Sequence, residues 1–181
     1  MSALNRRLAA DLDKAFPSFV GEMQSAVFNG ARRWVPTRQD AEDVSQETFV
    51  RAYQALQSYP SEQIATLRLR PWLFTITLNL CRNHARTRGR RPVQVAFGET
   101  ERAGGDDTQS SAMEAVAVDE WRDRLAALAP RQRDGIVLRH VVGLSYAEIA
   151  EVLGRPAGTV KSDVHRGLDR LRSMIGRSEN E

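Results

Sequence analysis

The segment over residues 92–113 divides the chain into two parts and limits how large a core either part can build. It is rich in glycine, aspartate and serine, and Phe97 is its only aromatic residue. Such a composition cannot bury enough apolar surface to offset the entropy that ordering costs. We therefore expect a flexible linker between two small domains, residues 1–91 and 114–181. Treated as a random coil, about 20 residues span roughly 25 Å (root mean square).

In the first part, apolar residues recur every three or four positions, which is the spacing of amphipathic helices. The expected helices span residues 2–14, 18–34, 40–58 and 71–91. Phe16-Pro17 is expected to interrupt the chain between the first two helices, and residues 58–70 are expected to form a loop that could hold one helical turn. Pro71 suits the first position of the last helix, where its missing N–H would be unpaired anyway.

The second part continues the helical spacing and adds signals for helix ends. Pro130 begins one expected helix, Ser145 and Glu148 form a capping box, and Gly154 stands where a short helix should end. A final helix is expected from about Ala157. A short helix, a glycine turn and a helix with polar residues at its start form a helix-turn-helix pattern, which is typical of DNA binding. A purely structural hairpin is the alternative. The sequence therefore predicts an all-α fold of two helical domains.

The expected helix over residues 71–91 has a face suited to nucleic acid. Beside its apolar face, a second line passes from an aromatic ring through small polar groups to arginines: Trp72, Thr75, Asn79, Arg82 and Arg86. No acidic residue occurs between Pro71 and Gly98. Such a face offers a stacking plane, base-edge hydrogen bonds and phosphate neutralisation, as single-stranded nucleic acid requires. An ordinary amphipathic helix with a solvated basic end is the alternative.

The expected helix over residues 40–58 carries a mixed acidic and aromatic surface. Its acids crowd the first half, where they suit the positive end of the helix dipole, and Glu47 and Arg51 are spaced for an ion pair. Phe49 and Tyr53 form an aromatic ridge beside them. The functional interpretation is a docking surface for a basic protein partner, and the alternative is a capped surface helix with solvated acids.

Composition excludes several classes of protein. The 181 residues carry a formal net charge of +3, and the single cysteine, Cys81, excludes an internal disulfide framework and fits a reducing cytosol. No apolar run reaches the ~18 residues that span a membrane, and the N-terminus lacks a signal-peptide core. We therefore expect a cytoplasmic protein without membrane insertion. Cys81 and His84 have ligand-like spacing, but no second pair follows, so we expect neither a metal site nor a cofactor.

Three segments together resemble one family. Residues 125–172 resemble the C-terminal promoter-binding domain of bacterial sigma factors, and residues 40–53 resemble the helix by which these proteins bind core RNA polymerase. Residues 71–91 resemble their helix that recognises and melts the minus-ten element. The order and spacing of the segments are similar to those of the extracytoplasmic-function (ECF) group of the sigma-70 family, over about four fifths of the chain.

The resemblance implies a sigma factor that binds core RNA polymerase and directs promoter-specific transcription initiation. Its implied partners are promoter DNA, the beta-prime clamp helices, the beta flap and an anti-sigma factor. The polymerase subunits would perform the chemistry, so the chain would not be an enzyme. The implied core-binding residues are Asp40, Asp43, Gln46, Glu47, Phe49 and Arg51. Those at the minus-ten element, beside the loop 58–70, are Trp72, Ile76, Asn79, Arg82, Asn83, Arg86, Arg90 and Arg91. Those at the minus-thirty-five element are Arg155, Thr159, Lys161, Ser162, His165 and Arg166.

Two residues depart from the usual pattern of the family. Asp163 stands where many members carry Arg; it could accept a hydrogen bond from a cytosine amino group or pair with Arg166 or Arg170 along the helix. Gly167 replaces a more usual Ala and would loosen the helix by up to about 1 kcal/mol. The main alternative is a response-regulator-type transcription regulator, which would need alternating strands and helices before the helix-turn-helix. A metal-dependent enzyme is a more remote alternative.

Overall fold

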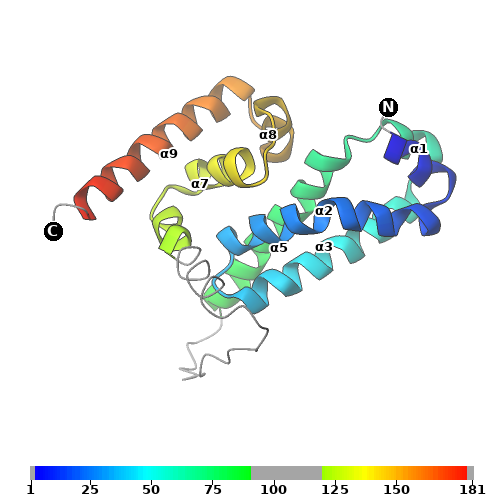
Figure 1. Ribbon diagram of the computed structural model, residues 1–181, viewed down its shortest axis with the longest axis horizontal. Helices are drawn as coiled ribbons and strands as arrows, with labels where there is room; N and C mark the ends of the chain where they lie inside the picture. The colour runs from blue at the N-terminus through cyan, green and yellow to red at the C-terminus, as the bar shows by residue number, and fades with distance from the viewer. Residues whose placement is uncertain (1–2, 91–119, 179–181) are drawn as a thin grey trace.

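The computed structural model describes residues 3–90 and 120–178, and within these ranges the regular secondary structure is helical, without strands (Figure 1). The all-α prediction is therefore confirmed, and the alternating strands of a receiver domain do not occur in residues 3–90. The predicted linker over 92–113 lies outside the described residues. No helix in the described ranges combines the length and apolarity needed to cross a membrane.

The first part is a bundle in which α2, α3 and α5 pack side by side (Figure 1). Its elements are α1 (Ala3–Ala10), α2 (Leu12–Trp34), α3 (Arg38–Ser58), α4 (Ser61–Thr66) and α5 (Leu69–Arg90). The side chains of Phe19, Phe74 and Leu56 are fully buried at its centre. Thr37 and Asp40 form a capping box before α3. The predicted loop over 58–70 contains α4, which is more helix than the single turn expected.

Two prolines of this part, Pro17 and Pro71, lie inside helices, which corrects two predicted boundaries. Pro17 does not interrupt the chain but lies within α2, and the break falls at Asp11, whose side chain caps α2 by accepting from the Lys14 N–H. Pro71 is the third residue of α5, not the first. A proline is tolerated there because the first four N–H groups of a helix have no partner within the helix.

The second part contains the predicted helix-turn-helix. Its elements are a helical segment over 120–126, α7 (Pro130–Ile136), the π-helix η1 (Val137–Val141), α8 (Tyr146–Leu153) and α9 (Ala157–Ser178). Ser145 and Glu148 form the expected capping box, and Gly154 ends α8 with a left-handed φ of 60°. The π-helix was not predicted, because a local widening of a helix leaves no mark on apolar spacing.

The two parts pack against each other, which the prediction of two linked domains did not anticipate. α5 lies against α8, and α2 lies against η1. A Cβ added to Gly30 of α2 would come within 3.3 Å of the Val142 side chain, so the absence of a side chain permits this close approach. Arg70 Nη2 donates to the Val142 carbonyl at 2.9 Å, and Arg68 pairs with Glu151.

Candidate nucleic-acid interface

The predicted polar line on α5 lies on the outside of the helix. Asn79, Arg82, Asn83 and Arg86 are exposed, whereas Trp72 and Ile76 are half-buried. The Trp72 ring lies 6.2 Å from the ring of Tyr59, which follows α3, so the start of the line is an aromatic pair. Arg90 is described only by its backbone and Arg91 not at all. The described part of α5 thus presents stacking, amide and guanidinium groups in the predicted order.

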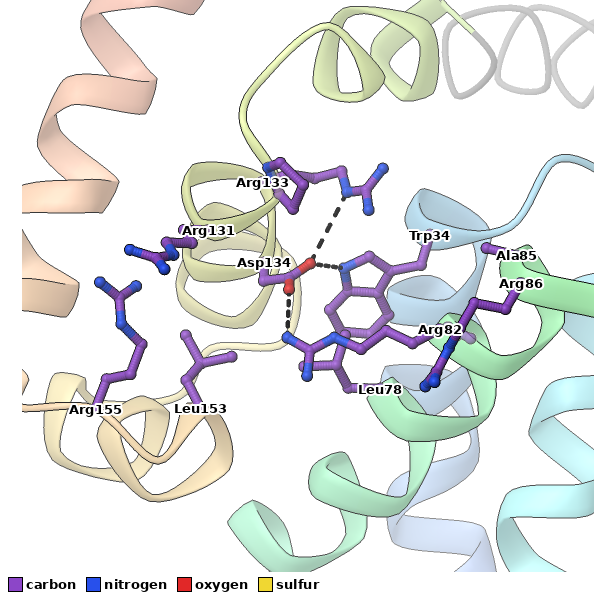
Figure 2. Close-up of a pocket in the computed structure, with 12 residues that line it drawn as sticks. Trp34, Leu78, Arg82, Ala85, Arg86, Arg131, Arg133, Asp134, Leu153 and Arg155 are labelled. Carbon is purple, nitrogen blue, oxygen red and sulfur yellow. Dashed lines mark hydrogen bonds and ion pairs between the residues drawn. The ribbon is translucent and has the colours of Figure 1, made fainter. Parts of the chain in front are cut away.

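Arg82 is held by a residue of the second part. Its Nη2 lies 2.8 Å from Asp134 Oδ2, and Trp34 Nε1 donates to Asp134 Oδ1 at 3.1 Å. Asp134 lies on α7 and is 3% exposed, while the Arg82 side chain remains 47% exposed. Figure 2 shows the indole and the guanidinium converging on this one carboxylate. Sequence reasoning missed both Trp34 and Asp134, because their positions are separated by 100 residues.

A cavity of about 550 Å³ surrounds this contact and is strongly basic (Figure 2). Its arginines come from α5, α7 and the turn after α8: Arg82, Arg86, Arg131, Arg133 and Arg155. Among the residues that the structure describes, Asp134 is the only acid in its lining. A predicted minus-ten residue, Arg82, and a predicted minus-thirty-five residue, Arg155, therefore line the same cavity.

Cys81 also lines this cavity, but its thiol is a poor nucleophile. Burial, with the nearby charge of Asp134, raises the pKa of its thiol to about 12, so it stays protonated at neutral pH. Its predicted neighbour His84 instead faces Asp40, with Nε2 3.1 Å from Oδ1. Within residues 3–90 and 120–178, no three His, Cys, Asp or Glu side chains are grouped so that they could hold a metal ion.

The helix-turn-helix exposes most of its predicted DNA-reading residues. Lys161, Ser162, His165 and Arg166 are exposed on the first turns of α9, while Thr159 and Arg155 are half-buried. Asp163 is 7% exposed; its Oδ1 accepts from Arg166 Nη2 at 3.0 Å and its Oδ2 from Arg155 Nη1 at 2.5 Å. The predicted pairing with Arg166 is confirmed, and the pairing with Arg155 was missed. Asp163 therefore fixes the guanidinium groups of two predicted DNA contacts.

Gly167 allows α9 to pack closely on α7. A Cβ at this position would lie 2.7 Å from Ile136 Cδ1 and 3.0 Å from Gln132 Cβ. Both are closer than ordinary contacts, so the departure from alanine has a packing reason. The expectation that Gly167 only loosens the helix was incomplete, because it considered the helix alone.

The acidic helix α3 divides its predicted residues between the core and the outside. Asp40 is 8% exposed, and its Oδ2 accepts from the Thr37 N–H at 3.2 Å, so the carboxylate serves the helix start. Phe49 packs edge-on against Phe19 of α2. The remaining predicted side chains reach solvent, fully or in part: Asp43, Gln46, Glu47 and Arg51. Glu47 forms the predicted ion pair with Arg51 at 2.6 Å. Val50, exposed to 49%, was missed.

Comparisons with known proteins agree with this geometry. Residues 19–91 match Sigma-70 region 2, and residues 119–171 match Sigma-70, region 4. The chain is 33% identical over 172 residues to the ECF RNA polymerase sigma factor SigE of Mycolicibacterium smegmatis, covering 92% of this chain and 65% of that protein. It is 37% identical over 161 residues to the RNA polymerase sigma-E factor of Streptomyces avermitilis, covering 88% of this chain and 84% of that protein.

A solved structure shows the same fold. The sigma factor RpoE of Bartonella quintana, in complex with the anti-sigma factor NepR, superposes with a TM-score of 0.67 at 26% identity, covering 90% of this chain and 98% of that one. The family matches cover both helical parts, in the order in which the α5 face and the helix-turn-helix occur. The chain therefore belongs to the extracytoplasmic-function group of RNA polymerase sigma factors.

Proposed function

We propose that three surfaces divide the work of this sigma factor, which directs the initiation of transcription by RNA polymerase. The exposed side of α3 binds the polymerase, the polar face of α5 binds the minus-ten element, and α8 with α9 binds the minus-thirty-five element. The observation that carries this proposal is the acid-free polar line of α5, exposed in one chain with a basic helix-turn-helix. The matched ranges 19–91 and 119–171 support domains over 1–91 and 114–181, joined by 92–113.

At the minus-ten element, α5 holds an unpaired base of the separated strand. Extruding a base costs a few kcal/mol of unstacking, which stacking and hydrogen bonds must offset. The half-buried Trp72, beside Ile76, supplies an apolar wall, and the exposed Asn79 supplies donor and acceptor groups for a base edge. The groups that hold the backbone of the strand are Arg82, Asn83, Arg86, Arg90 and Arg91.

At the minus-thirty-five element, the first turns of α9 enter the major groove. Ser162 and His165 are exposed and face the base edges, whereas Lys161 and the helix start contact phosphates. Arg155 and Arg166 approach from positions fixed by Asp163. Thr159 completes this set from the half-buried side of the helix.

The polymerase is bound through the outward residues of α3: Asp43, Gln46, Glu47 and Arg51. Val50 adds an exposed apolar group to the same helix, which is typical of a protein interface. The clamp helices of the beta-prime subunit are the partner of this surface, and the beta flap is the partner of the second part. Asp40 and Phe49 support the surface from below.

Regulation by an anti-sigma factor fits the family to which the chain belongs. The sigma factor RpoE of Bartonella quintana was solved with the anti-sigma factor NepR, and that structure covers nearly the whole of this chain. We place this protein beside RNA polymerase in the cytoplasm, where the polymerase subunits perform the chemistry. Sigma factors are initiation factors, not enzymes.

Run-off transcription with core polymerase tests the proposal. Asn79→Ala should lower transcription from a native minus-ten element at least several-fold, yet hardly affect a template whose bubble is already melted with altered bases. Asn29→Ala, at an exposed asparagine on a different helix, α2, is the matched control and should leave both unchanged. Equal loss on both templates would contradict the base-pocket role, and transcription without the chain would contradict the function as a whole.

A further inference from the structure

The contact between the two parts involves a residue that promoter binding also requires. Arg82 lies on the polar face of α5, yet its guanidinium is bound to Asp134 of α7. We propose that Asp134 and Trp34 form an intramolecular lock that holds the chain closed and competes with promoter DNA for Arg82. This inference rests on the proposed function of α5, because the competition requires that Arg82 binds the DNA backbone.

The dimensions of a promoter make the closed arrangement incompatible with full recognition. Elements named minus ten and minus thirty-five lie about 25 base pairs apart, which is about 85 Å at 3.4 Å per base pair. In the structure, Arg82 and Arg155 line one cavity of about 550 Å³. Two surfaces that share such a cavity cannot occupy both elements at once. The two parts must therefore separate when the promoter is bound.

Asp134 offers Arg82 the same kind of hydrogen bond that a DNA phosphate offers. A guanidinium forms charge-assisted hydrogen bonds to a carboxylate and to a phosphate in the same way. Asp134 is 3% exposed and takes its second hydrogen bond from the Trp34 indole, at 3.1 Å. Trp34 and Arg82 both belong to the first part, so both hydrogen bonds to Asp134 form only when the two parts meet. Arg82 cannot bind Asp134 and a phosphate in the same orientation.

The surrounding contacts show that the lock closes a larger interface. Arg70 donates to the Val142 carbonyl at 2.9 Å, Arg68 pairs with Glu151, and Gly30 permits α2 to approach Val142. Among these groups, Asp134 is the charged residue that is almost wholly buried. Only the open fraction of the chain can bind the promoter, so the apparent affinity falls by that fraction.

The test measures closure and transcription in the same full-length protein. Spin labels are attached at Ser25→Cys on α2 and His140→Cys on η1, two exposed positions on helices that pack together. The labelled proteins also carry Cys81→Ala, because Cys81 lines the cavity between the two parts and separation of the parts would expose its thiol to the label. Double electron–electron resonance gives the fractions of short and long distances. Run-off transcription with limiting chain gives the concentration for half-maximal product.

Two variants loosen the lock, and a third is a control that makes the charge change of Asp134→Asn at another site. Asp134→Asn removes the charge that holds Arg82, and Trp34→Phe removes the indole hydrogen bond without changing net charge. Asp123→Asn makes the same charge change at a side chain that is 74% exposed and pairs with the adjacent Arg122. If Asp134→Asn fails to fold, Trp34→Phe still decides the outcome.

We expect wild type and Asp123→Asn to show one short distance, and both lock variants to show an added population at long distance. The half-maximal concentration should fall at least threefold in the lock variants and stay unchanged in Asp123→Asn. Unchanged distances in both lock variants would overturn the lock while leaving the sigma-factor function intact. Longer distances with unchanged transcription would overturn the competition. If wild type itself did not support transcription, the proposed function would fail, and the competition with it.

Discussion

Two buried aspartates of the second part hold arginines in place, and they differ in what they connect. Asp163 is 7% exposed and binds Arg155 and Arg166, which lie eight and three residues away. Asp134 is 3% exposed and binds Trp34 and Arg82, which lie 100 and 52 residues away. The first contact forms whenever the helix-turn-helix folds, whereas the second forms only while the two parts are packed. Asp163 therefore fixes the proposed minus-thirty-five surface, whereas Asp134 can release the proposed minus-ten surface when the two parts separate.

Replacing one arginine partner of each aspartate by alanine should separate the two roles most strongly. Arg82→Ala leaves the buried Asp134 with the Trp34 hydrogen bond and with Arg133, whose Nε lies 3.8 Å from Oδ1, as its remaining charge partner. This loss should disfavour the packed arrangement by about 2 kcal/mol, less than the cost of a buried charge left with no partner. Arg166→Ala should cost less than about 1 kcal/mol, because the Arg166 side chain is 65% exposed and Asp163 keeps Arg155. Urea titrations followed by the spin-label distance and by circular dichroism would measure both.

Arg86→Ala is the control for this pair, since Arg86 is exposed and bonds only Asn83 of its own helix among the contacts described. It should leave the packed arrangement unchanged. If Arg82→Ala behaved like Arg86→Ala, the Arg82–Asp134 pair would contribute nothing to closure, and the contrast between the two aspartates would disappear.

Removing Asp163 should alter specificity more than stability. Asp163→Ala frees Arg155 and Arg166 together, and a well-aligned hydrogen-bonding pair between a side chain and a base discriminates by roughly 1–3 kcal/mol at one position. A randomised minus-thirty-five library, transcribed by wild type and variant, would show a changed preference at one or two positions. Lys161→Ala is the comparison, because loss of a phosphate contact should weaken all sequences alike. An unchanged preference for Asp163→Ala, with transcription merely scaled, would reject the positioning role.

These two aspartates also show what the sequence could and could not predict. The pairing of Asp163 with Arg166 was predictable because residues three apart are neighbours on a helix. The helices, the capping boxes at Thr37 and Ser145 and the glycine end of α8 were predictable for the same reason, since each depends on a few adjacent residues. Their confirmation explains why the fold class was predictable.

The Trp34–Asp134–Arg82 contact was not predictable, because nothing in local spacing says which helix of one part meets which helix of the other. Trp34 reads as an ordinary apolar residue, and Asp134 as one acid among the arginines of α7. The burial of Asp40 was missed for a related reason. Its acidic neighbours indicated a surface, whereas the capping box and His84 draw this carboxylate inward.

Gly167→Ala tests whether the packing of α9 on α7 is rigid. The role of Asp163 in fixing arginines on α9 requires that it is. Alanine favours a helix by up to about 1 kcal/mol over glycine, but the added Cβ would lie 2.7 Å from Ile136 Cδ1 and 3.0 Å from Gln132 Cβ. Overpacking of this kind costs typically about 1–3 kcal/mol, so we expect a net loss of about 1 kcal/mol in urea unfolding. Gly158→Ala, where nothing lies within 4 Å, should instead be neutral or stabilising. A stabilised Gly167→Ala would show that α7 can move away from α9.

The smallest expected effect concerns Glu148, whose pKa depends on hydrogen bonds within the second part and on charges of the first part. Partial burial would raise its pKa, but hydrogen bonds from the Ser145 backbone and side chain, with the charges of Arg70 and Arg68, outweigh burial and lower the pKa below 4.5. A carboxyl whose pKa is lowered by folding stabilises the fold above its unfolded pKa. That contribution is lost as pH falls from about 4.5 through the folded pKa.

Two variants separate the local and the long-range parts of this shift. Ser145→Ala removes the hydroxyl bond to Glu148 Oε2 at 2.7 Å and keeps the backbone bond at 2.8 Å. Arg68→Gln removes a charge of the first part and changes side-chain volume little. Both should raise the pKa of Glu148, followed by carbon-13 NMR, and Ser145→Ala should raise it more, because a direct hydrogen bond acts at shorter range than a screened charge. A larger rise for Arg68→Gln would mean that packing between the two parts, and not the cap of α8, controls this carboxylate.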